Sequence, residues 1–220
     1  MDKIMEYQPE IWLSIGQTFI MVGISVLAAV LIGLPLGTYL YLSRKGNLYE
    51  NRMRFALLDT VVNIVRSFPF LLLVVFLIPF TRWIVGSAIG TMAATVPLSI
   101  ISIAYYARLV EQSLLDVPKS IIEAAISMGA SPTQIIFKFL YREARSGLVF
   151  GLTTATVSFI SYSTVMGIVG GGGVGDFAIR YGYQRFETGL MTYTILLMVI
   201  LVQIIQMTGT TIAKKLDKRS

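Results

Sequence analysis

The sequence predicts an all-α, polytopic membrane protein with a single domain that covers residues 1–220. Of its residues 55% are hydrophobic and only 14% are charged, a balance outside that of soluble domains. Apolar runs long enough to cross a hydrocarbon core of roughly 30 Å recur along the chain. The five runs that we expect to form transmembrane helices occupy residues 18–42, 55–80, 88–110, 147–169 and 190–212.

Two residue types that carry much of protein chemistry are missing. The chain has no cysteine, which excludes a disulfide framework and a cysteine-based metal site. It has no histidine either, which removes the commonest general base and metal ligand. We therefore expect no catalytic residue, no metal site and no enzymatic activity in this chain.

The first run follows a polar start that lacks the basic segment and cleavage site of a secretory signal, so we expect an uncleaved span. Gly33, Pro35 and Gly37 interrupt this run. Such residues in a span indicate close packing of helices or a kink.

The second run contains polar residues at Asp59, Asn63 and Arg66, followed by Pro69. An ionisable side chain inside a span suggests a function, because its burial in lipid is costly. Arg66 is predicted either to line a polar cavity or to pair with Asp59. The alternative for Asp59 is a place at the membrane interface, beside the basic segment that precedes this run.

The interval at residues 111–146, between the third and fourth runs, predicts two short helices outside the membrane. Ser120 and Glu123 have the spacing of a capping box, and Gly129 suits the left-handed position that closes a helix. Ser131 and Gln134 form a second capping box. The first helix is too short to be stable alone and needs a packing partner. Its expected contact face consists of Ile121, Ile122, Ala125 and Met128.

Glu123, Ala124, Ala125 and Gly129 resemble the EAA loop of bacterial ABC-importer permeases. The resemblance implies the transmembrane fold of type I ABC importers and a short cytoplasmic coupling helix that docks on a separate ABC ATPase. These four residues would be the ATPase-coupling residues. Phe139, Tyr141 and Arg142 depart from the second half of the family pattern. The alternative reading of this interval is an ordinary amphipathic connector.

The fourth run is rich in Ser, Thr, Gly and Ala, which is typical of tightly packed membrane helices. Polar groups and a thioether gather near its end, at Tyr162, Ser163 and Met166. In the family that the chain resembles, this helix lines the substrate path. The candidate substrate contacts are therefore these three residues and Asn63 of the second run.

The glycine-rich loop that follows, residues 170–175, has the outer glycine spacing of a phosphate-binding P-loop. Asp176 and Phe177 stand where Lys and Ser or Thr are required, so we reject nucleotide binding there. The stretch 170–186 is similar to the methionine-importer branch of the ABC permeases. This resemblance implies methionine as the substrate, with both stereoisomers and close analogues left open.

The distribution of Lys and Arg predicts the topology. Thirteen of the 18 lie in the segments after the first and third runs and in the C-terminal tail, which places those segments in the cytoplasm. The N-terminus and the glycine-rich loop then lie outside. The net charge of +6 thus reflects membrane topology and gives no indication of nucleic-acid binding.

The resemblance also implies an assembly in the bacterial inner membrane. Five helices hardly enclose a solute path, so we expect a homodimer with the path on its two-fold axis. Each coupling loop would contact one of two ATPase subunits, which bind ATP and Mg, and an extracytoplasmic methionine-binding protein would deliver the solute. Two alternatives remain: an ABC importer for another amino acid or small solute, and a self-contained channel or ion-coupled transporter.

Overall fold

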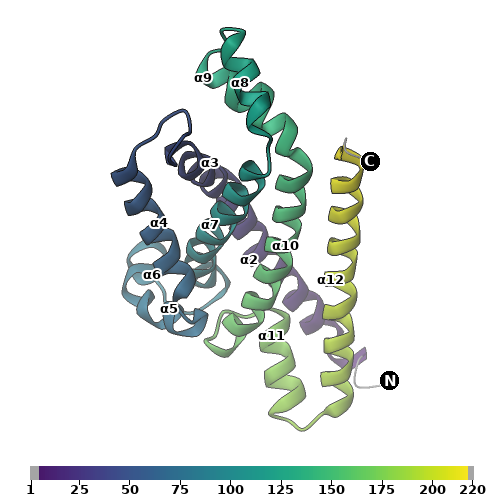
Figure 1. Cartoon of the computed structure of the whole chain (residues 1–220). Helices are drawn as coiled ribbons and strands as arrows, with labels where there is room; N and C mark the ends of the chain where they lie inside the picture. Colours follow the sequence, from purple (N-terminus) through teal and green to yellow (C-terminus); the bar gives the residue numbers. More distant parts are fainter. Residues whose placement is uncertain (1–4, 218–220) are drawn as a thin grey trace.

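A computed structural model describes residues 5–217 of the chain, and all regular elements in this range are helical (Figure 1). In chain order the elements are α2 (Gln8–Ala28), the π-helical turn η1 (Ala29–Gly33), α3 (Leu34–Ser43), α4 (Arg52–Ser67), α5 (Phe70–Phe76), α6 (Ile78–Val85), α7 (Thr91–Leu115), α8 (Lys119–Ser127), α9 (Pro132–Gln134), the π-helical turn η2 (Ile135–Leu140), α10 (Tyr141–Ile168), α11 (Gly173–Phe177), the π-helical turn η3 (Ala178–Tyr183) and α12 (Thr188–Leu216).

The first apolar run forms one continuous helix, Gln8–Ser43, in which η1 joins α2 to α3. Two glycines of this helix face α7. A Cβ atom on Gly33 would lie 2.8 Å from the carbonyl oxygen of Ile103, and one on Gly37 would lie 2.2 Å from that of Ala107. The close helix packing expected from Gly33 and Gly37 is therefore present, because only glycine allows the two backbones to approach this far.

The centre of the molecule is α7, which lies between α2–α3, α4 and α10. In its most apolar window 61% of the residues are buried, compared with 11% in α12. The main hydrophobic cluster joins α7 to the first helix, α8, η2 and α10 through side chains such as Val110, Leu114, Leu140 and Phe159. The peripheral helix α12 exposes Val199, Ile200 and other large apolar side chains, as expected of a surface that faces lipid.

The expected span 55–80 is not one helix. It bends by 104° between α4 and α5, and α6 then continues past the end of the predicted span. Phe68, which precedes Pro69, has an extended backbone with ψ of 130°. The residue before a proline is sterically disfavoured in the helical region, so the helix stops there and restarts in a new direction at Phe70.

Four described helices are long and apolar enough to cross a membrane, or five if the bent pair α4–α5 counts as one span. Two of them, Gln8–Ser43 and Pro132–Ile168, have 36 and 37 residues and exceed the apolar runs that they contain. At 1.5 Å per residue, helices of this length are about 55 Å long, well over the membrane core of roughly 30 Å. The second of these helices begins with α9, so its length is sufficient for α8 and α9 to lie beyond the membrane core.

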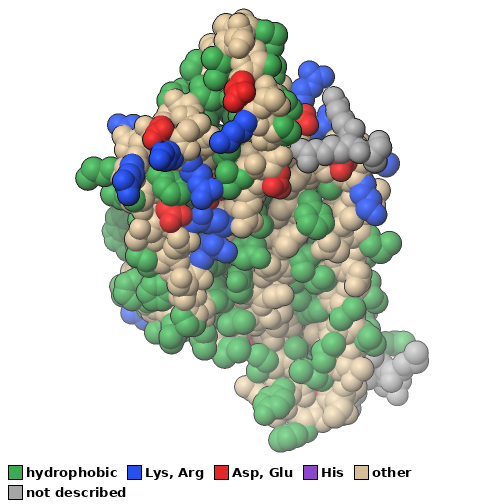
Figure 2. All heavy atoms as spheres, viewed as in Figure 1, with side chains coloured by type: hydrophobic (Ala, Val, Ile, Leu, Met, Phe, Trp, Pro, Cys, Tyr) green, Lys and Arg blue, Asp and Glu red, His purple; other side chains and the backbone are tan. Residues whose placement is uncertain are grey.

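The two ends of the molecule differ in composition. The described ends of the chain lie toward opposite ends of the bundle, with the C-terminus toward the end that carries α8 and α9 (Figure 1). Lys, Arg, Asp and Glu gather around α8, the start of α4 and the end of α12, whereas the opposite half is mainly apolar (Figure 2). This separation is the one expected if the charged end lies in water and the apolar half lies in lipid.

Candidate functional site

The segment α8–α9 projects from the helix bundle and contains the four predicted coupling residues (Figure 1). The helix α8 ends in a left-handed turn at Gly129, whose φ is 73°. The Gly129 N–H donates to the carbonyl oxygen of Ile126 at 2.9 Å, and the Ala130 N–H donates to that of Ala125 at 3.0 Å. This pair of hydrogen bonds is a Schellman motif, so the predicted closing position at Gly129 is confirmed.

The two predicted capping boxes have different outcomes. At Ser131 the box is present, because Ser131 and Gln134 each accept a hydrogen bond from the other's backbone N–H. At Ser120 the prediction is wrong: α8 begins at Lys119, after Pro118, and no side chain caps it. Pro118 fixes the chain direction at this point, and the helix starts one residue before the serine.

The exposed surface of α8 differs from the expected contact face. Ala125 is fully buried and Ile122 is half-buried, and both pack against the main hydrophobic cluster. Glu123 and Ala124 are exposed, as are Ile126 and Met128, which are 53% and 70% exposed. The apolar spacing correctly indicated an amphipathic helix, but part of the apolar face packs on the chain's own helices. Sequence reasoning missed Ile126, which only the three-dimensional packing reveals.

Gly129 lies next to open space. No heavy atom is within 4 Å of the position that a Cβ atom would take there. The need for glycine therefore comes from the left-handed backbone alone within this chain, and the elbow leaves room for a partner surface.

Arg108 forms the centre of a partly buried ion network that sequence reasoning missed. Its guanidinium donates to Asp59 at 2.6 Å, to Asn63 at 2.8 Å and to Glu111 at 2.5 Å. Glu111 is only 1% exposed and also lies 3.6 Å from Arg44. The network joins α4 to α7 near the charged end of the bundle. Asp59 therefore pairs with Arg108 and not with Arg66. The two residues are 49 positions apart in the sequence and meet only in the folded chain, so no local pattern indicates the pair.

Arg66 lies near a group of aromatic side chains. Its guanidinium carbon is 5.9 Å from the centre of the Tyr105 ring, and the hydroxyl of Ser158 donates to the Tyr105 hydroxyl oxygen at 3.3 Å. The ring of Tyr162 stacks on Phe70 with centroids 4.7 Å apart. The bend α4–α5 and the helix α10 thus present a surface that combines aromatic faces with one cation.

The four candidate substrate contacts occupy two environments. Asn63 is exposed and borders an open groove of about 490 Å³ at the bend between α4 and α5, and Tyr162 is half-buried. Ser163 is 1% exposed, and its hydroxyl donates to the carbonyl oxygen of Ile160 at 2.7 Å. Met166 is 3% exposed and packs with Met21, Leu73 and other apolar side chains.

The glycine-rich loop serves as a tight packing element. A Cβ atom on Gly175 would lie 2.4 Å from the carbonyl oxygen of Thr164, so α11 lies directly against α10. The N–H groups at the start of α11 bind the first helix: Gly173 donates to Gln17 at 2.7 Å and Val174 donates to Thr18 at 2.9 Å. These amides have protein acceptors, which agrees with the rejection of a phosphate site.

Among residues 5–217 no group of three or more Asp and Glu side chains is placed to hold a metal ion. The polar features of the described structure are thus the projecting segment α8–α9, the ion network around Arg108 and the aromatic surface near Tyr162.

Residues 29–220 match the family described as binding-protein-dependent transport system inner membrane component. The probable D-methionine transport system permease protein MetI of Vibrio cholerae is 47% identical over 203 residues, which is 92% of this chain and 90% of that protein. The methionine import system permease protein MetP of Bacillus subtilis is 41% identical over 180 residues, or 82% of this chain and 81% of that protein.

Solved structures agree with these sequence matches. A chain from a structure described as inward facing conformations of the MetNI methionine ABC transporter superposes with a TM-score of 0.92 and 40% identity. The superposition covers 96% of this chain and 99% of the solved one. The fold, the projecting elbow and the sequence thus lead to one conclusion: the chain belongs to the family of binding-protein-dependent transport system inner membrane components.

Proposed function

We propose that this chain, a permease subunit of an ABC importer, moves methionine into the cytoplasm. Relatives that carry the names of methionine and D-methionine transport proteins support this substrate, since they are 40–47% identical over most of this chain. Both stereoisomers and close analogues belong to the proposal. The competing prediction of a self-contained channel or ion-coupled transporter calls for several acidic residues deep in the spans, and Asp59, which alone supports it, forms an ion pair with Arg108.

The observation that carries the proposal is the projecting segment α8–α9. It leaves the bundle at the charged end and exposes Glu123, Ala124, Ile126 and Met128, with open space at Gly129. We propose that this segment docks on a cytoplasmic ABC ATPase, which binds ATP and Mg. In this arrangement the exposed side chains contact the ATPase, while Ala125 anchors α8 to the permease.

We further propose a homodimer in which each elbow contacts one ATPase subunit. A path on the two-fold axis would be lined by the bend α4–α5 and by α10, where Asn63 and Tyr162 are accessible. Ser163 and Met166 would support Tyr162 from the interior of α10. Movement of the two elbows on ATP-driven closure would then switch the access of the path, and a binding protein would deliver methionine from outside.

The orientation is part of the proposal. The end that carries α8, α9 and the C-terminus holds most of the basic residues, which favours a cytoplasmic location for that end. The N-terminus and the segment between α6 and α7 would then lie outside, in the inner membrane of a bacterial cell.

Gly129→Asp tests the coupling role. The change strains a left-handed backbone and introduces a charge at the proposed contact, so we expect loss of co-purification with the ATPase encoded beside this gene. Gly129→Asn has the same shape without the charge and tolerates the left-handed conformation, so it should retain more of the complex.

Gly86→Asp is the matched control, because Gly86 also has positive φ, at 80°, has open space around it and lies between α6 and α7. It should leave the complex intact. Equal binding by wild type and Gly129→Asp would contradict the coupling role. Uptake of radiolabelled L- and D-methionine by cells that express the complete transporter tests the substrate, and a complex that takes up neither would refute that assignment alone.

A further inference from the structure

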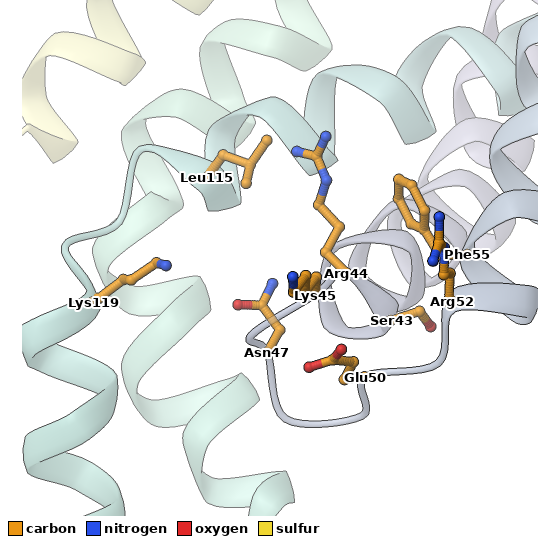
Figure 3. Close-up of a pocket in the computed structure, with 9 residues that line it drawn as sticks. All are labelled: Ser43, Arg44, Lys45, Asn47, Glu50, Arg52, Phe55, Leu115 and Lys119. Carbon is orange, nitrogen blue, oxygen red and sulfur yellow. The ribbon is translucent and has the colours of Figure 1, made fainter.

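A cavity of about 650 Å³ lies at the charged end of the bundle and has no part in the proposed transport path. It is formed where several elements end: α3, the loop 44–51, the start of α4, the end of α7 and the start of α8. The residues that line it are Ser43, Arg44, Lys45, Asn47, Glu50, Arg52, Phe55, Leu115 and Lys119 (Figure 3).

The cavity has an excess of positive charge. Four of its lining residues are basic, Arg44, Lys45, Arg52 and Lys119, and they come from three separate segments. Figure 3 shows Lys119, at the start of α8, pointing toward the loop that carries Lys45 and Asn47. Like charges that converge in this way repel one another, so an anion in the cavity would stabilise the arrangement.

The acidic groups nearby leave most of this charge unbalanced. Glu50, the only carboxylate among the lining residues, accepts a hydrogen bond from the Gly46 N–H at 2.9 Å and so closes the loop on itself. Arg44 lies 3.6 Å from the buried Glu111, which also binds Arg108.

Two apolar side chains, Phe55 and Leu115, also line the cavity, and Leu115 is 44% exposed. The helices that contain α3, α4 and α7 are long and apolar enough to cross a membrane, and their ends meet at the cavity, which favours a position near the headgroups of the bilayer. A basic pocket bordered by apolar side chains at this depth matches a ligand with an anionic head and hydrocarbon tails.

We propose that this cavity binds a phosphate group, and that its source is the headgroup of an anionic phospholipid of the cytoplasmic leaflet. Arginine guanidinium and lysine ammonium groups both bind phosphate oxygens, and the Asn47 side chain lies beside them. The acyl chains would lie along Phe55 and the exposed side of Leu115. The bound headgroup would join Lys119 of α8 to the loop 44–51, and so brace the base of the projecting segment against the bundle.

The test compares lipid retention by the full-length protein in nanodiscs that contain equal amounts of phosphatidylglycerol and phosphatidylcholine. Lipids that stay bound are identified by native mass spectrometry. We expect preferential retention of phosphatidylglycerol, reduced by about 25-fold in the double variant Lys45→Gln/Arg52→Gln, since each basic residue near an anionic lipid contributes roughly fivefold. Both side chains are exposed, so their replacement should leave the fold intact.

The matched control is Lys214→Gln/Lys215→Gln, which removes the same charge from the last turn of α12, outside the cavity. It should retain phosphatidylglycerol as the wild type does. An equal loss in both double variants would overturn the proposal, because it would indicate general surface attraction.

Two further measurements separate the lipid from other occupants. In nanodiscs of phosphatidylcholine alone, inorganic phosphate at millimolar concentration could protect the protein against heat as well as phosphatidylglycerol does in the mixed nanodiscs. If it does, and if Lys45→Gln/Arg52→Gln abolishes this protection, the source is free phosphate and the lipid assignment is overturned. If the intact transporter with its ATPase retains no phosphatidylglycerol while the isolated permease does, the cavity is an ATPase contact and the lipid assignment fails. Failure of methionine uptake would bear on the transport proposal alone.

Discussion

Arg108 shows how a single residue holds two helices together. It contacts Asp59 of α4 and Glu111 of its own helix α7, and the side chain of Glu111 is almost completely buried. A buried ion pair adds little net stability, because desolvation opposes the attraction between the charges. Its removal on one side only is costly, since an isolated buried charge remains.

Arg108→Met should therefore lower the stability of the permease by about 3 kcal/mol, because Glu111 would lose its strongest partner. For a chain of this size that corresponds to a fall of about 5–10 °C in the unfolding midpoint, measured by thermal unfolding in nanodiscs. Arg180→Met is the control, because Arg180 and its partner Asp176 are both partly exposed. This variant should change the stability by less than about 1 kcal/mol.

The double variant Arg108→Met/Glu111→Gln provides the second check. It removes the charge of the buried carboxylate, which in Arg108→Met keeps only Arg44 at 3.6 Å, so we expect partial recovery of the unfolding midpoint. A double variant that is less stable than Arg108→Met alone would show that the loss comes from packing and not from the isolated charge.

At the level of elements, the sharpest feature is the 104° bend between α4 and α5. Its cause is local: Phe68 is extended because Pro69 follows it, and Pro69 precedes the first turn of α5. Asn63 borders the open groove at the bend together with Phe68 and Pro69, and Phe70, just past the bend, stacks on Tyr162. The position at which this span breaks is therefore set by one proline.

Pro69→Ala should weaken the bend. Alanine removes the restriction on Phe68 and restores a backbone N–H, so α4 can extend toward Phe70 in a fraction of the molecules. We expect altered hydrogen exchange at the amides of residues 68–72 and a several-fold lower rate of the proposed methionine uptake. Pro79→Ala is the control, because Pro79 lies in the first turn of α6, where proline fits a helix. Equal effects of both changes would show that the bend does not depend on Pro69.

For the whole molecule, the separation of charged and apolar ends predicts a topology that can be tested directly. The chain has no cysteine, so single cysteines can be introduced without removing any native ones. Ser87→Cys lies between α6 and α7, and Ser127→Cys lies at the end of α8; both serines are exposed.

In intact spheroplasts, a membrane-impermeant maleimide should label Ser87→Cys and leave Ser127→Cys unlabelled. Both should react after the membrane is permeabilised. The reverse pattern would place α8 outside the cell and contradict the proposed contact with a cytoplasmic ATPase. A third variant, Ser67→Cys at the bend, should react slowly from either side if it borders a path inside the dimer.

The sequence was sufficient for the helical class, the elbow and the left-handed turn, because apolar run length and a glycine at a helix end are local signals. The sequence was insufficient for side-chain contacts between residues that are far apart in the chain. Asp59 was placed at the interface or with Arg66, since nothing local indicates Arg108. In the same way, the burial of Met166 depends on Met21 and Leu73, which belong to other helices. The size of the bend at Pro69 likewise depends on how α5 packs on α7.

The hydrogen bonds from α11 to Gln17 and Thr18 have a consequence for biogenesis. The paired groups are 156 residues apart in sequence, so the first helix enters the membrane long before its partners are synthesised. At roughly 5–20 residues per second, translation takes about 10–30 s to reach them. The hydrogen bonds between the first helix and α11 thus form late, after most of the bundle has been synthesised. A nascent chain that stops before Gly173 leaves two polar side chains in a span without these amides, a state that a membrane quality-control protease can recognise.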